Sequence, residues 1–139
     1  MQDVKHVIEA ITKRAARHTP SIRRIAAMGI GEAVRQGDVY LTRLADLPDD
    51  RGAATDNRQL APGSTRGSRH IVAAQSDVTI TAPPKGSTVL VGPVIESRSR
   101  LLVEHPEHGH IDLPPGIYQT SFQRDYARER AEEIRRVQD

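Results

Sequence analysis

Aromatic side chains are scarce in this sequence, and that scarcity limits the kind of core it can build. The 139 residues include three Tyr, one Phe and no Trp. Because aromatic rings each bury a large area and often dominate core energetics, Val, Ile, Leu and Ala must fill most of the interior. We therefore expect a small aliphatic core that gains part of its stability by packing against copies of the chain or another partner. The absence of Cys also excludes disulfides and thiolate metal sites.

Two amphipathic helices are predicted at the start of the chain. Apolar residues recur at helical spacing over residues 3–18, and Thr19-Pro20 is a typical boundary at which one helix ends and another begins. A second helix is predicted over about 20–35, although two glycines weaken its last turns. Because two short helices are marginally stable alone, they must dock on the rest of the chain or on a neighbour. The apolar residues predicted to form that interface are Val7, Ile8, Ile11, Ile22 and Ile25.

Short strands separated by turn residues are predicted after Gln36. Segments rich in β-branched residues are interrupted by Pro-Gly, Pro-Pro and Gly-Pro turns. The strands are predicted at residues 37–44, 58–61, 69–74, 77–81, 87–96, 99–104, 111–113 and 117–126. A final helix is predicted over 127–137, where apolar residues again recur at helical spacing.

The expected fold class is α+β. It combines two N-terminal helices, a mostly antiparallel small β-sandwich or partly open barrel, and one C-terminal helix. The predicted organisation is an N-terminal helical segment at 1–35 and a β-rich domain with its C-terminal helix at 36–139.

Charge is unevenly distributed, although the net charge is only +2. Residues 1–36 carry seven Lys or Arg against three Asp or Glu, whereas residues 101–139 carry five against eight. Opposed charges suit head-to-tail or lateral association between copies, although a charged run is more often a solvated face. Nucleic acid is expected to bind non-specifically at most, because the basic segment lacks aromatic residues that stack on bases.

No membrane partner is expected from the sequence. No apolar run approaches the length of a membrane span, and charged residues interrupt the N-terminal apolar positions where a secretory signal would lie. The expected location is therefore the cytoplasm, or a virion if the protein is phage-borne.

Six short segments resemble a group of small uncharacterised bacterial and phage proteins. The segments are Gln36-Gly37-Asp38-Val39, Gly67-Ser68-Arg69-His70-Ile71, His105-Pro106-Glu107-His108, Leu113-Pro114-Pro115-Gly116-Ile117-Tyr118-Gln119, Gln123-Arg124-Asp125-Tyr126 and Arg135-Arg136-Val137-Gln138-Asp139. The resemblance covers about residues 36–139 and leaves the N-terminal helices outside it. It implies no activity, and its phage connection implies a virion or assembly component.

A histidine-rich segment is the densest chemical cluster in the sequence. His105, His108 and His110 lie in a predicted hairpin loop, and His70 is a candidate fourth ligand. Imidazoles at this spacing are typical ligands of Zn²⁺, Ni²⁺ or Fe²⁺. The H-x-H pair resembles that of metal-binding cupins, but the Glu and the later His of that pattern are missing. The alternative is a polar hairpin whose histidines are solvated or hydrogen-bonded to the backbone.

A loop rich in Gly, Ser and Arg is a candidate anion site. Its backbone N–H groups, together with Arg66 and Arg69, are suited to hold a phosphate. The loop lacks the Gly-Lys-Ser/Thr of a P-loop and precedes a strand rather than a helix. The alternative is an ordinary loop whose arginines pair with nearby carboxylates. No catalytic residue is predicted, because a Ser68–His70 hydrolase pair would lack the Gly-x-Ser-x-Gly elbow.

Two functions from different classes remain open. The first is a non-enzymatic structural or assembly protein, such as a capsid-associated phage component, that self-associates or binds other structural proteins without a cofactor. The second is a His-based metal-binding protein or metalloenzyme that holds a divalent transition metal. The amphipathic helices, the thin aliphatic core and the missing catalytic signature favour the first.

Overall fold

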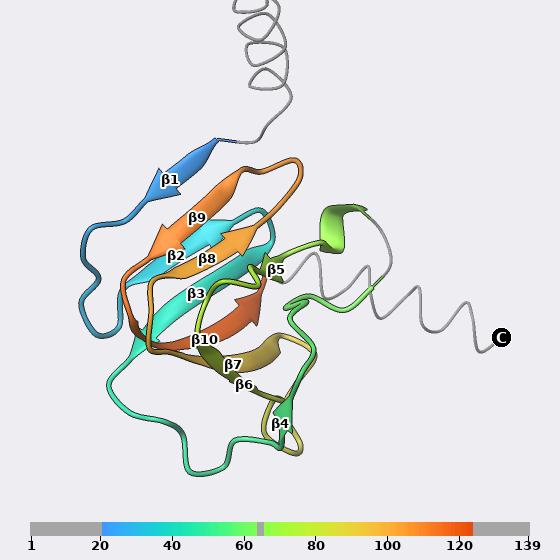
Figure 1. The fold of residues 1–139 in the computed structure, drawn as a ribbon. Helices are drawn as coiled ribbons and strands as arrows, with labels where there is room; N and C mark the ends of the chain where they lie inside the picture. Colours follow the sequence, from blue (N-terminus) through green and yellow to red (C-terminus); the bar gives the residue numbers. More distant parts are fainter. Residues whose placement is uncertain (1–20, 64–65, 124–139) are drawn as a thin grey trace, which may run out of the picture.

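Two β-sheets make up the part of the chain that the structure describes. The structure is a computed structural model, and it describes residues 21–63 and 66–123. The sheets have the strand orders β1-β9-β8-β5 and β2-β3-β10-β7-β6-β4 (Figure 1). Within the described residues the only helical element is a single 3-10 turn, η1 (Arg66–Ser68). No helix in these two ranges is long and apolar enough to cross a membrane.

The four-stranded sheet is formed mainly around one hairpin. Its strands are β1 (Ile22–Arg24), β5 (Ile71–Val72), β8 (Leu101–Glu104) and β9 (His110–Leu113). β8 and β9 pair antiparallel, and the turn between them holds the histidine-rich segment. β1 lies at one end of the sheet and pairs parallel with β9. The N-terminal part of the described chain is therefore attached next to the histidine-rich turn.

The six-stranded sheet is antiparallel throughout. Its strands are β2 (Ala33–Gln36), β3 (Val39–Leu44), β4 (Ala54–Thr55), β6 (Val78–Thr81), β7 (Val91–Ser97) and β10 (Gly116–Phe122). The central strand β10 pairs with β3 on one side and β7 on the other. β2 and β3 form a hairpin whose turn contains Gly37, with a φ of 56°. That positive φ is readily adopted by glycine.

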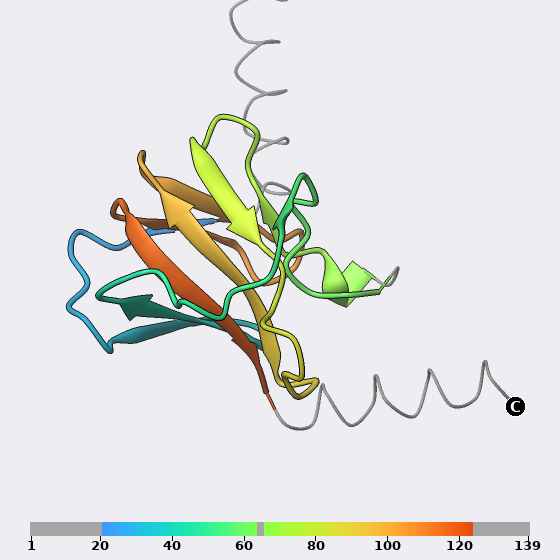
Figure 2. The same cartoon turned by 90° about the horizontal axis from the view of Figure 1, so that it is seen from below.

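One hydrophobic core lies between the two sheets, which form the two layers seen from below in Figure 2. Along β8 and β9 every second side chain is buried, as expected for strands with one face toward a core. Buried side chains from both sheets join one cluster, among them Leu41, Ile95, Leu101, Val103, Leu113 and Tyr118. Burying each aliphatic side chain is worth about 1.5–3 kcal/mol, so this shared cluster holds the layers together.

The predicted α+β class is wrong, because no α-helix occurs in the described residues. The predicted second helix is instead β1, a loop and β2. Ile22 and Ile25 were expected on one apolar helix face, but Ile22 is exposed and Ile25 is only partly buried against the core. The backbone of this segment pairs with β9 and β3, and such distant partners override local periodicity. The predicted helices at 3–18 and 127–137, and Val7, Ile8 and Ile11, lie outside the described residues.

Candidate functional site

Three loops that are distant in sequence meet beside β9. They are residues 36–37 where β2 ends, residues 67–70 before β5, and residues 105–109 in the turn between β8 and β9. Each belongs to one of the segments on which the sequence resemblance rests. Their contacts join the buried side chains of Gln36, His70 and His105 into one polar cluster.

Gln36 joins the three loops through a single buried side chain. Its Nε2 donates hydrogen bonds to the carbonyl oxygens of Val103 and Gly109, at 3.0 and 2.7 Å. Its Oε1 lies 2.8 Å from Nδ1 of His70, which is also buried. Because an amide oxygen only accepts, His70 must carry its proton on Nδ1. The contact therefore fixes the tautomer of His70.

His105 is held by hydrogen bonds at both ring nitrogens. Its Nδ1 accepts the backbone N–H groups of Glu107 and His108, each at 3.0 Å. The ring proton must therefore lie on Nε2, which donates to the carbonyl oxygen of Gly67 at 3.1 Å. His105 thus shapes the tight turn of its own hairpin and attaches it to the loop before β5.

The rings of His70, His105 and His108 lie in a row with their planes tilted to one another, which we call the histidine row. Neighbouring ring centroids are 4.4 and 4.5 Å apart, with interplanar angles of 49° and 37°. Burial, together with the charge that His105 and His108 can carry, lowers the pKa of His70 to about 3. Burial also lowers the pKa of His105. Both rings are therefore neutral at neutral pH, which permits them to lie against each other in the interior.

The predicted metal ligands are only partly brought together. His70, His105 and His108 lie in the row, whereas His110 accepts the backbone N–H of His105 at its Nδ1, at 3.1 Å. Both nitrogens of His105 are already used, so it would have to break these bonds to bind a metal. Among the described residues no three His, Asp or Glu side chains form a group arranged to hold a metal ion. The four-histidine metal site stays a prediction.

A cleft opens beside the histidine row, with a volume of about 510 Å³. Its lining residues come from β1 and the residue before it, from the end of β2 and the turn after it, and from the β8–β9 hairpin. Its lining residues are Ser21, Arg23, Arg35, Gln36, Gly37, His108, His110 and Ile111. The lining contains two guanidinium groups and no carboxylate. We call this feature the arginine cleft.

Sequence reasoning missed Arg23 and Arg35 as site residues. Both fell in the predicted second helix, where they belonged to a diffuse basic segment. Their proximity depends on β1 and β2 lying at neighbouring ends of two different sheets, which no local pattern reveals. Of the predicted anion site, Arg69 does not line the cleft, and the side chain of Arg66 lies outside what the structure describes. Arg69 is exposed beside buried His70, and an anion site at these two residues stays a prediction.

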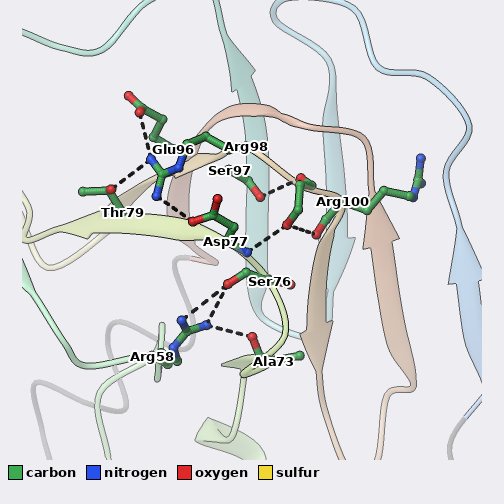
Figure 3. Close-up of polar contacts among 10 residues, drawn as sticks. Arg58, Ala73, Ser76, Asp77, Thr79, Glu96, Ser97, Arg98 and Arg100 are labelled. Atoms are coloured by element: carbon green, nitrogen blue, oxygen red, sulfur yellow. Dashed lines mark hydrogen bonds and ion pairs between the residues drawn. The ribbon is translucent and has the colours of Figure 1, made fainter.

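A second polar cluster connects β6 and β7 to the turns next to them (Figure 3). Arg58 donates to the carbonyl oxygens of Ala73 and Ser76, at 2.7 and 3.4 Å. Arg98 bonds the side chains of Asp77, Thr79 and Glu96. The pKa of Asp77 is lowered by its hydrogen bond from Arg98. Because the arginines of this cluster are already paired or hydrogen-bonded, its evident role is to hold the turns in place.

The geometry defines a small two-sheet β-protein whose loops are tied together by neutral, buried histidines beside a basic cleft. The chain belongs to the family described as Domain of unknown function (DUF8820), which matches residues 35–123. That match confirms the expectation of a family without an assigned activity, and it spans the whole histidine row. The comparisons with curated proteins and with solved structures found no match.

Proposed function

We propose that the protein is a non-enzymatic assembly component that associates with copies of itself through β1 and the loop that follows it. The sequence resemblance to phage proteins points to a virion as the setting of this assembly. The observation that carries the proposal is a pair of exposed apolar side chains, one on an end strand and one in the loop that follows it. Ile22 on β1 is 59% exposed, and Ile30 in the following loop is 70% exposed.

The position of β1 supports this choice of surface. It is the end strand of its sheet, and all three of its side chains are exposed. An end strand presents backbone N–H and C=O groups that can pair with a strand from another chain. A second copy is the simplest such partner, because a two-fold axis lets the same strand pair with itself.

The histidine row supports a non-catalytic role. A general base needs a nitrogen that is free to take a proton and a pKa near the working pH. Both nitrogens of His105 are hydrogen-bonded, and the pKa of His70 is far below neutrality. The role we assign to these two histidines is therefore to hold the loops together through hydrogen bonds.

The proposal is tested by light scattering on the full chain and on the double variant Ile22→Glu/Ile30→Glu. We expect the wild type to be an oligomer and the double variant to dissociate, because two charges would be buried in the interface. Val89→Glu is the matched control, since Val89 is 63% exposed but lies in the β6–β7 loop. A wild type that is monomeric at every concentration would overturn the proposal, and so would equal dissociation of the control.

Metal binding is a second candidate function, favoured by the close approach of three histidine rings. A metal bound to the folded state would raise the apparent melting temperature by mass action. The test is elemental analysis of the purified protein, with thermal shifts on adding Zn²⁺ or Ni²⁺ to the wild type and to His108→Ala/His110→Ala. Metal that is retained by the variant as well as by the wild type would rule out these ligands.

A further inference from the structure

We infer that the arginine cleft binds a phosphorylated small molecule through Arg23 and Arg35, with the imidazoles of His108 and His110 as further hydrogen-bond donors. This site lies within one chain and does not rest on self-association. It also differs from the anion site predicted at Arg66 and Arg69.

The first support is uncompensated positive charge. Within the described residues, the ion pairs of the arginines are those of Arg98 with Asp77 and Glu96, and of Arg100 with Asp112. Arg23 and Arg35 have no carboxylate within ion-pair distance in the same ranges. Two guanidinium groups thus share a concave surface that lacks acidic residues. Concave surfaces of one charge concentrate ligands of the opposite charge.

The second support is the fixed position of Arg35. Its Nε donates to the carbonyl oxygen of Gly37 at 2.6 Å, and its Nη2 donates to Oε1 of Gln123 at 2.8 Å. The guanidinium carbon lies 5.7 Å from the centroid of the Tyr40 ring. These contacts hold the group while Nη1 makes no hydrogen bond to any described residue. A guanidinium that is already ordered loses little entropy when it binds an oxyanion.

The third support is the tautomer of His110. Its Nδ1 accepts the backbone N–H of His105, so the proton of the neutral ring lies on Nε2. The residue therefore offers a hydrogen-bond donor without needing to be charged. Ser21, at the rim, is held through its carbonyl oxygen by the backbone N–H of His110 at 2.7 Å, and its hydroxyl is a further donor.

The ligand class follows from charge and size. Two guanidinium groups match a phosphate monoester, which carries about −1.5 to −2 at neutral pH. The volume of about 510 Å³ lies within the range of small-molecule sites, roughly 300–1,000 Å³. It is much larger than one phosphate group requires. We therefore expect the phosphate to be attached to a small organic group of nucleotide size.

The test is calorimetric titration of the full chain at constant ionic strength, with AMP, inorganic phosphate, acetate and adenosine as probes. We expect AMP to bind more tightly than phosphate, and acetate and adenosine to bind weakly or not at all. Replacing a charged donor to phosphate should weaken AMP binding about tenfold or more. That loss is expected for Arg23→Gln and for Arg35→Gln, with circular dichroism showing that each variant is folded.

Arg24→Gln is the matched control. Arg24 is the next residue on β1 and is also exposed, but it does not line the cleft. We expect this variant to bind AMP as the wild type does. The inference would be overturned if Arg23→Gln and Arg24→Gln lost the same amount of affinity for AMP. It would also be overturned if acetate bound as tightly as phosphate, or if AMP did not bind at all. A monomeric wild type would end the assembly proposal without affecting this titration.

Discussion

Gln36 and Gly37 set the geometry of the candidate site at the scale of single residues. The Gln36 side chain joins β2 to His70, to β8 and to the turn before β9 through three hydrogen bonds. Leaving any of these buried groups without a partner costs about 1–3 kcal/mol. The next residue, Gly37, lies so close to His108 that an added Cβ atom would be 2.5 Å from the ring. The histidine row is therefore shaped by two neighbouring residues that are not histidines.

A double-mutant cycle tests the packing of Gly37 against His108. Gly37→Ala should destabilise the fold for two reasons, the positive φ of 56° and the clash with the ring. Adding His108→Ala should remove the clash and leave only the backbone strain, about 1–2 kcal/mol. Urea unfolding of the four proteins in the cycle measures the coupling.

Gly86→Ala is the control for backbone strain alone. Its φ is 79°, and an added Cβ would have no neighbour within 4 Å. We expect Gly86→Ala to cost less than Gly37→Ala by the free energy of the clash. Additive effects of the two changes in the cycle would show that Gly37 does not touch the ring.

The low pKa of His70 makes stability depend on pH in a defined window. The folded pKa is about 3, whereas an unfolded His titrates near 6.5. The unfolded chain therefore binds a proton that the folded chain excludes, so the stabilisation is complete above about pH 6.5 and is lost as the pH falls toward 3. In that window His70 alone contributes a slope of up to about 1.4 kcal/mol per pH unit.

Urea unfolding of the wild type and of His70→Gln between pH 4 and 7 measures this slope. The variant will be less stable at pH 7, but its stability should fall less steeply toward acid pH. The pKa of His105 is also lowered, so His105 also makes the protein less stable at acid pH. Part of the pH dependence of stability should therefore remain in both proteins. An unchanged slope in the variant would mean that His70 is protonated in the folded state.

The sequence predicted part of the candidate site at this scale. It marked His70, His105, His108 and His110 because histidine density is visible in a linear sequence. It did not mark Gln36, whose role depends on three partners from distant segments. Nor could it show which ring nitrogens are protonated, since that depends on the acceptors each ring meets in the folded chain.

At the scale of elements, one arginine reinforces the backbone pairing of β1 with β9. Arg100 lies just before β8, and its Nε bonds Oδ1 of Asp112 in β9 at 2.6 Å. Its Nη2 donates to the carbonyl oxygen of Ile25 at 2.6 Å, immediately after β1. The side chain thus crosses β9 and holds the far end of β1 against the sheet.

Arg100→Gln should loosen β1 and cost about 1–3 kcal/mol, because partly buried charge-assisted hydrogen bonds are lost. Amide hydrogen exchange at residues 22–25 should become faster. Arg98→Gln is the control, since Arg98 and its partners are more exposed and exposed ion pairs contribute little. Unchanged exchange at residues 22–25 in Arg100→Gln would show that β1 is held by other contacts.

The strands of the β8–β10 region were predicted well, and the segment around β1 was not. Predicted strands at 99–104, 111–113 and 117–126 correspond to β8, β9 and β10. Alternating burial and clear turn residues made them visible. Residues 20–35 failed because their isoleucines recur at helical spacing, while the structure leaves Ile22 and Ile30 exposed. All three side chains of β1 are exposed. Its sequence therefore lacks the alternation of apolar and polar residues that identifies a strand with one buried face.

At the scale of the whole molecule, two sheets share one mostly aliphatic core. Tyr118 is the one aromatic residue in the main cluster, and its hydroxyl donates to the carbonyl oxygen of Pro114 at 2.5 Å. The scarcity of aromatics predicted such a core, but it did not predict which strands would supply it. The loops between the sheets bring the histidine row and the arginine cleft to the same corner as the exposed surface of β1.

The concentration dependence of amide hydrogen exchange tests the assembly claim most directly. If β1 pairs with another copy, exchange at residues 22–24 should slow as the protein concentration rises. β4 (Ala54–Thr55) is the internal control, because it is also an exposed end strand but belongs to the other sheet. We predict protection that increases with concentration at β1 and stays constant at β4. Exchange at β1 that is independent of concentration, or that slows equally at β4, would contradict the account.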